Sequence, residues 1–390
     1  MQYKGKWGFV MNLSIKGKGK QYGLFLAFFV LLSFVSVWGI ANIFGDGSLH
    51  IDLSFLSPSV LLSLIVLFVI FCYLDGVRFY FILKALGQSV SLWYIIQITF
   101  VNKFLSSITP FASGGGPLQV YLLTKKNVPA GCGIAATLIR TVLPIIFFFI
   151  TVPLILLHND SLQALIPGYD PYLYIGVMVI FYLVIGSGFF YLIYHQRMIQ
   201  VLIYKTCKRA GKNKLFRRFD MNRVCKTLLR ELTHFTYNIK MFFKGEKKYV
   251  LLSVISALLF LLSLFLFPYV LVSSMGYRMA LIPVLEFSAV ITFITYAAIT
   301  PGAAGIAEGA FALIFSGFIS ASSSTTLTFL WRFFTVYAGS LFGMGSLYYL
   351  MIRLKANDKN QKQQLTQVIE HSCSKLQLVY KYQVTKPSES

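Results

Sequence analysis

Seven ionisable side chains lie within the apolar stretches of this 390-residue sequence, and they are the residues that could do chemistry. They are Asp75, Arg78, Lys103, Arg140, Glu286, Glu308 and Arg332. A charge inside a membrane is costly, so each becomes a candidate for binding, transport or gating if those stretches cross one. No nucleophile–base pair accompanies them, and no GxxxxGK[ST] phosphate loop is present. The sequence therefore predicts no catalytic residue, no metal site and no cofactor.

Two glycine clusters precede short predicted helices, one over 117–124 and one from about 306. The clusters consist of Gly114, Gly115 and Gly116 in the first stretch, and Gly302 and Gly305 in the second. Exposed backbone N–H groups and the positive end of the following helix can together bind an anion without any side chain. The alternative interpretation is that the glycines let two helices cross at close distance.

Arg140 and Arg332 each lie in the apolar span that follows one of these clusters. A guanidinium group keeps its charge at any depth and binds phosphate through two parallel hydrogen bonds. The two arginines, near two helix N-termini, predict a cradle for a lipid phosphate. The alternative is that an arginine pairs with Glu308 or Glu286 and only holds helices together.

The remaining charged residues each have two interpretations. Glu308, in the first turn of a predicted helix, is either a capping residue or a ligand for a proton or a cationic headgroup. Glu286 and Lys103 are assigned the same headgroup or proton role, and Lys103 shares a polar helix face that could instead bind another helix. Asp75 and Arg78, three positions apart, form either a local ion pair at the membrane interface or a gate.

The elements that position these residues are predicted to be membrane helices. The chain is 57% hydrophobic and only 12% charged, whereas a soluble domain carries roughly 25% charged residues. Full spans are predicted at about 22–43, 58–83, 128–157, 172–194, 249–273 and 326–352. Two further apolar stretches, 91–124 and 281–320, are broken by a Thr-Pro pair and glycines. Unwound backbone inside a membrane is tolerated only where protein or water covers it.

The distribution of charge predicts the topology. Of the net charge of +22, much lies in the loop 195–248, which holds fifteen Lys and Arg residues. The positive-inside rule places that loop, the basic N-terminus 1–21 and the polar tail 353–390 in the cytosol. The membrane domain, 22–352, then holds two re-entrant hairpins that open to opposite sides. The predicted fold is an all-α integral membrane protein with about six full spans and two broken-helix hairpins in inverted repeats.

The basic loop is expected to contact lipid rather than nucleic acid. Apolar residues between 224 and 242 recur every three or four positions, which predicts a basic amphipathic helix on the inner leaflet. The basic residues lie in loops, where they would be attracted to anionic headgroups. The five cysteines form no CxxC pair and no Cys/His cluster, so neither a disulfide nor zinc is predicted.

Three segments resemble the flippase-like family, also called the lysylphosphatidylglycerol synthase transmembrane region. ITPFASGGGPLQVYLLTKK at 108–126 looks like its first signature, ITPGAAGIAEG at 299–309 its second, and LWRFFTVY at 330–337 its arginine-bearing motif. The resemblance covers roughly 20–352. At Gly116 the family often has an acidic or amide residue, which leaves Glu308 as the candidate ligand for a lysyl headgroup.

The resemblance implies transbilayer movement of lipid. In lysyl-phosphatidylglycerol members a cytosolic transferase domain aminoacylates the lipid and the membrane domain flips it, which gives resistance to cationic antimicrobial peptides. Other members resemble carriers of polyprenyl phosphates or lipid-linked sugars. With 390 residues the sequence leaves no room for a transferase domain, so synthesis by this chain alone is not expected.

The leading hypothesis is a flippase-like transporter of an anionic or aminoacylated phospholipid, of lysyl-phosphatidylglycerol type, in the cytoplasmic membrane of a bacterium. Three alternatives stay open. The first is a phosphatidylglycerol lysyltransferase, alone or with a separate lipid-modifying enzyme. The second is a carrier of polyprenyl phosphate or lipid-linked sugar, and the third is a scaffold whose basic loop recruits a partner. A homodimer also stays open, and no nucleic-acid partner is expected.

Overall fold

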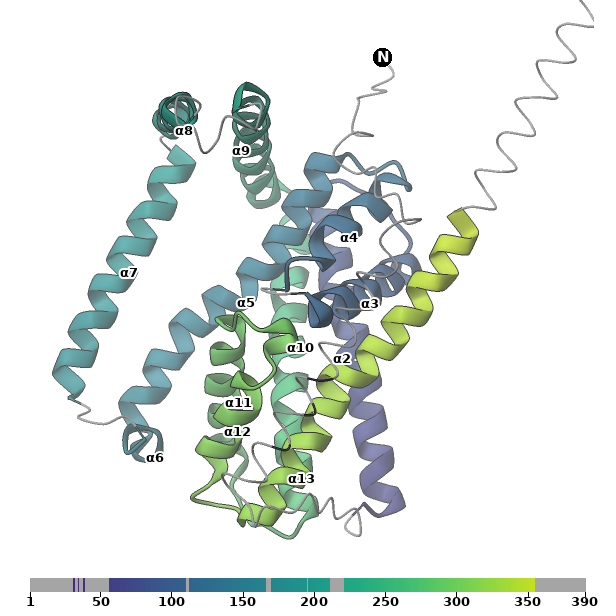
Figure 1. Cartoon of the computed structure of the whole chain (residues 1–390), viewed down its shortest axis with the longest axis vertical. Coiled ribbons are helices and arrows are strands. Elements are labelled where there is room, and N and C mark those ends of the chain that lie inside the picture. Colours follow the sequence, from purple (N-terminus) through teal and green to yellow (C-terminus); the bar gives the residue numbers. More distant parts are fainter. Residues whose placement is uncertain are drawn as a thin grey trace, which may run out of the picture. The chain divides into compact units, whose positions relative to one another are not determined.

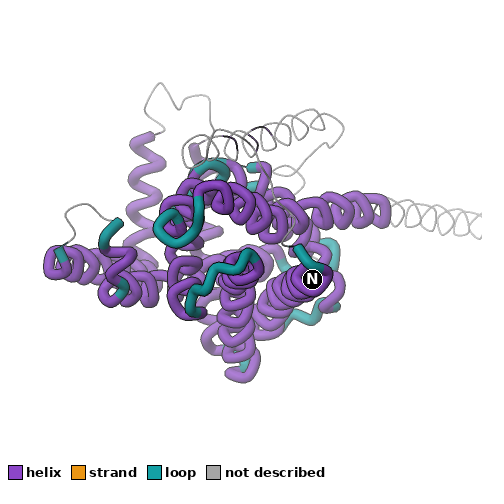
Figure 2. The backbone as a smooth tube through the Cα atoms, turned by 90° about the horizontal axis from the view of Figure 1, so that it is seen from below, coloured by secondary structure: helices purple, strands orange, loops and turns teal. Residues whose placement is uncertain are grey.

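The computed structural model describes most of the predicted membrane domain. The described residues are 56–109, 112–165, 170–194, 196–210 and 221–354, together with Leu31, Phe34 and Trp38. Every regular element among them is a helix (Figure 2), which confirms the all-α prediction for this part of the chain. The predicted N-terminus 1–21, nearly all of the predicted span 22–43, the proline at the first predicted break and the tail after 354 lie outside the described residues.

Three helices are long and apolar enough to cross a membrane: α2 Pro58–Ala85, α5 Ala130–His158 and α10 Lys247–Ser274. Each agrees within a few residues with a predicted span. The start of α2 is fixed by its sequence, because the side chain of Ser57 accepts a hydrogen bond from the backbone N–H of Val60 and a proline occupies the first helical position. The helices α2 and α10 pack along one another (Figure 1).

Two further predicted spans agree in part with the observed helices. The predicted span 172–194 coincides with α7, Pro171–Tyr194, which is apolar throughout. The predicted span 326–352 begins within α13 Ala321–Arg332, continues through the π-turn η5 Phe333–Tyr337 and stays helical to 343. Residues 344–354 belong to a separate unit and are themselves helical. The count of six spans and the cytosolic position of both ends stay predictions.

Both interrupted stretches are pairs of helices with a break between them, as predicted. The first consists of α3 Leu92–Ile108 and α4 Gly115–Thr124. The second consists of α11 Leu281–Tyr296, the 3-10 turn η4 Pro301–Ala303 and α12 Ile306–Phe315. In each, two short helices replace the single long helix that would be needed to cross a bilayer.

The backbone at both breaks includes residues with positive φ angles. In the second hairpin φ is 59° at Gly302, 58° at Ala303 and 84° at Gly305, and in the first it is 52° at Ala112. Residues with a Cβ rarely adopt these angles, while glycine does so at little cost. The glycines at 302 and 305 therefore let the chain leave one helix and start the next within a few residues.

The helices on either side of the two hairpins repeat one set of contacts. In the first half, α2 contacts α3, α3 contacts α4, α4 contacts α5, and α2 contacts α5. In the second half, α10 contacts α11, α11 contacts α12, α12 contacts α13, and α10 contacts α13. Each contact of one half thus has a counterpart in the other. The two hairpins also meet, because helix α3 of the first contacts η4 at the break of the second.

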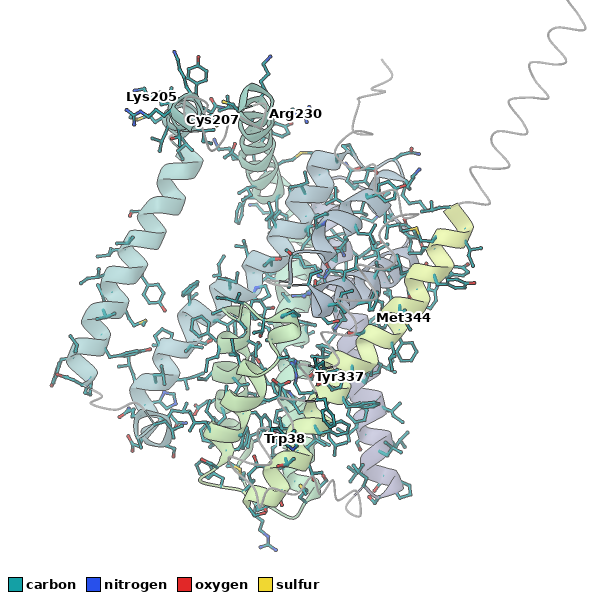
Figure 3. The ribbon with its side chains drawn as sticks, viewed as in Figure 1. Trp38, Lys205, Cys207, Arg230, Tyr337 and Met344 are labelled. Carbon is teal, nitrogen blue, oxygen red and sulfur yellow. The ribbon has the colours of Figure 1, made fainter. Side chains whose placement is uncertain are left out.

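The described part of the basic loop contains the helices α8 Gln196–Ala210 and α9 Met221–Lys244. Figure 3 labels Lys205 and Cys207 on α8 and Arg230 on α9. The predicted amphipathic helix is therefore present as α9. Part of its apolar face is covered by protein, however, since α9 packs on α8 and α5 and the side chains of Ile239 and Phe242 are buried. Those two side chains are not available to a lipid leaflet.

Candidate functional site

A cavity of about 600 Å³ lies where the two interrupted stretches meet. Its wall comes from α2, α3, α4, α5, α10 and α11, from the two breaks and from the helix that follows α12. The charged residues on that wall are Asp75, Arg78, Lys103, Arg140 and Arg332. Five of the seven ionisable residues singled out from the sequence are therefore gathered in one place.

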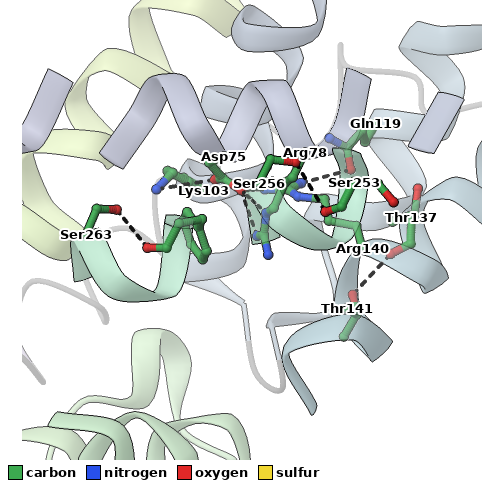
Figure 4. A network of polar contacts seen from close by, with 11 residues as sticks. Asp75, Arg78, Lys103, Gln119, Thr137, Arg140, Thr141, Ser253, Ser256 and Ser263 are labelled. Carbon is green, nitrogen blue, oxygen red and sulfur yellow. Dashed lines mark hydrogen bonds and ion pairs between the residues drawn. The ribbon is translucent and has the colours of Figure 1, made fainter. Parts of the chain in front are cut away.

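Asp75 is the centre of this group (Figure 4). Its Oδ1 atom accepts hydrogen bonds from Nε of Arg78 and from Nη2 of Arg140, both at 2.8 Å, and its Oδ2 atom lies 3.4 Å from Nζ of Lys103. The carboxylate is 1% exposed. The predicted ion pair between Asp75 and Arg78 is present, but it is buried and joined by cations from α3 and α5 rather than local to one helix. The gate function stays a prediction.

Two of the cations also lie on aromatic rings. Nζ of Lys103 is 3.6 Å from the centre of the Phe71 ring, and the guanidinium carbon of Arg78 is 3.8 Å from that of Phe260. The two rings stack on each other at 5.0 Å. A desolvated cation gains about 2 kcal/mol or more from such a ring. These contacts offset part of the cost of burying positive charge that Asp75 alone does not balance.

Some donors of the buried guanidinium groups have no hydrogen-bond partner. They are Nη1 of Arg78 and Nε of Arg140, while Nη1 of Arg140 lies 3.4 Å from Oε1 of Gln119. A buried donor that is left unsatisfied costs about 1–3 kcal/mol. The two unsatisfied donors therefore add to the cost of burying this cluster.

Arg332 and Glu308 form a second buried ion pair, with Nε and Oε1 2.8 Å apart. Oε2 of Glu308 accepts the backbone N–H of Gly305 at 2.7 Å, and Arg332 donates to the carbonyl oxygen of Gly302. Glu308 does not line the cavity. The geometry thus supports the capping interpretation of Glu308 and the helix-holding interpretation of its pairing with an arginine.

Gly114 and Gly115 lie in close contact with α3 and the turn that follows it, whereas a Cβ atom on Gly305 would meet nothing within 4 Å. The N–H group of Gly114 donates to Oγ1 of Thr109 at 2.9 Å, so it is already engaged. A Cβ atom on Gly115 would lie 2.5 Å from Oγ of Ser106. Of the five glycines, Gly116 and Gly302 line the cavity. The phosphate cradle of backbone N–H groups stays a prediction.

Glu286 is not part of the cavity wall. Its carboxylate lies 2.8 Å from Nε2 of His158 and 2.6 Å from Nδ2 of Asn159. These contacts join α11 to the end of α5. The structure therefore does not bring Glu286 to the site, although the sequence assigned it the same role as Glu308.

We expect Glu308→Gln to destabilise the protein much more than Glu286→Gln. Removing one partner of a buried pair costs about 3–5 kcal/mol, because the other charge is left uncompensated. Arg332 is 3% exposed and would be that charge, whereas the His158 side chain that faces Glu286 is 62% exposed. The measurement is the melting temperature of each variant in a neutral detergent. Equal losses for the two variants would contradict the structural role of Glu308.

One residue of the site was missed by the sequence analysis. Gln119 in α4 is fully buried beside Arg140. A signal was present, because an amide within an apolar stretch needs a polar partner. The sequence did not show that Gln119 pairs with Arg140, which lies 21 residues away.

Comparison with known proteins agrees with this description. The model of the family "Lysylphosphatidylglycerol synthase TM region" matches residues 21–343. A UPF0104 membrane protein of Archaeoglobus fulgidus is 26% identical over 82% of this chain and 96% of its own length. A UPF0104 membrane protein of Methanocaldococcus jannaschii is 24% identical over 85% of this chain and 96% of its own length. Both relatives are archaeal, so they do not support the predicted bacterial source. No solved structure matches.

Proposed function

We propose, from the premise that this chain belongs to the family of the lysylphosphatidylglycerol synthase transmembrane region, that it carries the anionic headgroup of a lipid across a membrane. One observation carries the proposal, namely the cavity whose wall holds four cationic side chains and one carboxylate. Burying this much positive charge is costly, and the two carboxylates that pair with it do not balance it. A phosphate group needs such positive charge around it in order to leave water.

The arrangement of the helices supports transport rather than simple binding. The matching contacts of the two halves are those expected of an internal repeat, and the two broken helices meet at the cavity. Transporters built in this way hold their substrate near the midplane, between the repeats, and expose it to each side in turn. The headgroup would occupy the cavity while the acyl chains stay in lipid.

Arg140 and Arg332 are the residues whose loss should reveal this function. They lie on opposite halves of the molecule, in α5 and α13, and both line the cavity. Each charge-assisted hydrogen bond to a phosphate contributes about 1.5–3 kcal/mol, so losing one lowers the affinity by roughly tenfold or more.

The test is lipid translocation in proteoliposomes that contain a fluorescent phosphatidylglycerol. The fraction of label accessible to a membrane-impermeant quencher measures the rate. We expect Arg140→Ala with Arg332→Ala to lower that rate by roughly tenfold or more, while Glu286→Gln, which lies outside the cavity, leaves it unchanged. A double variant that transports as fast as the unmodified protein would exclude this site as the route of the headgroup.

A further inference from the structure

The charges around the cavity do not balance. Four cationic side chains, Arg78, Lys103, Arg140 and Arg332, line its wall. Among the described residues in contact with them, two carboxylates, Asp75 and Glu308, face these four cations. Four positive charges against two negative charges leave an excess of two. Excess charge in a membrane domain is costly until a ligand of the opposite sign neutralises it.

Neither carboxylate is free to bind a cationic group. Asp75 is in contact with three cations, and Glu308 is occupied by Arg332 and by the N–H group of Gly305. A headgroup with an amine, such as an aminoacylated lipid, would bring positive charge to a wall that is already too positive. The donors that lack a hydrogen-bond partner here, Nη1 of Arg78 and Nε of Arg140, belong to cationic side chains of the wall, which favour an anion instead.

We infer that the cavity prefers a lipid headgroup that carries two negative charges at neutral pH, either a phosphate monoester or a diphosphate diester. This inference rests on the proposed function and names its substrate class. A phosphate monoester carries about −1.5 to −2 at pH 7, because its second pKa is about 6. A phosphodiester such as phosphatidylglycerol carries one negative charge and would leave half of the excess unbalanced.

The inference can be tested with two matched probes. Dodecyl phosphate is a monoester, and dodecyl methyl phosphate has the same chain and phosphate with one fewer ionisable oxygen. We expect the purified protein at pH 8 to bind the monoester about tenfold more tightly or better, since an additional charge interacts strongly in a poorly solvated site. At pH 5, where the monoester carries one charge, the two affinities should become similar. A dodecyl methyl diphosphate should bind tightly at both pH values, which distinguishes the two headgroup types.

Lys103→Gln provides a second measurement. It reduces the excess charge from two to one, and it breaks the longest of the three contacts of Asp75, so the fold is expected to tolerate it. The preference for the monoester at pH 8 should fall to about threefold or less, while Glu286→Gln should keep the full preference. Equal affinities for the two probes at pH 8 would overturn the inference, and would leave the proposed function standing if phosphatidylglycerol transport still depended on Arg140.

Discussion

Asp75→Asn is expected to lower the melting temperature of the protein more than the loss of any one cation of the cavity. The amide would leave Arg78, Lys103 and Arg140 close together with no carboxylate between them. Removing the countercharge of a buried pair costs about 3–5 kcal/mol, and here three cations share it. The measurement is thermal unfolding of the purified variant in a neutral detergent.

Added inorganic phosphate should restore part of the stability lost in Asp75→Asn. An anion that binds only the folded state stabilises it by an amount that grows with its concentration. The three cations of the variant, which lack a countercharge, should bind phosphate more tightly than the unmodified cavity does. The control is Glu286→Gln at the same phosphate concentration, which corrects for general salt effects. A variant that melts at the same temperature as the unmodified protein, or gains no more from phosphate than the control, would show that Asp75 is not the countercharge.

Gly115→Ala is the second change with a large expected effect. A Cβ atom at this position would lie 2.8 Å from the carbonyl oxygen of Asn102 and 2.5 Å from Oγ of Ser106. The first of these is backbone and cannot turn away, so α3 and α4 would have to separate. Overpacking of this kind costs about 1–3 kcal/mol. It would also displace Lys103, which lies next to Asn102 on the cavity wall, so transport should be lost together with stability.

Gly116→Ala is the matched control for this prediction. It is the next residue and it lines the cavity, yet a Cβ atom there would lie 3.5 Å from Cγ2 of Thr137, which is an ordinary contact. We expect its melting temperature to stay within about 1 °C or 2 °C of the unmodified protein, as for most mild substitutions. If Gly115→Ala were as stable and as active as Gly116→Ala, the close approach of α3 and α4 would not be required.

Local features of the chain were predictable from the sequence. The long helices, the two breaks and the start of α12 at Ile306 follow from apolar run length, proline and glycine, which act within a few residues. The candidate residues Arg140 and Arg332 followed from the cost of charge in lipid. These signals need no knowledge of how the helices pack.

The pairing of the charges could not be predicted, because it depends on packing. Asp75 and Arg140 are 65 residues apart, and only the contact of α2 with α5 brings them within 2.8 Å. For the same reason Glu286 and Glu308 looked alike in the sequence, although the first is joined to the end of α5 and the second to Arg332. The close crossing at Gly115 also depends on the packing of α4 against α3. The residues next to Gly115 in the sequence do not reveal that contact.

The contact between α3 and η4 has a mechanical consequence. Because the first hairpin touches the turn of the second, neither can tilt without moving the wall that the other supplies. In the proposed transport, opening of the cavity by one hairpin would therefore be coupled to a shift of the other hairpin. This contact between a helix and an unwound turn would make the two hairpins move together while a headgroup passes through.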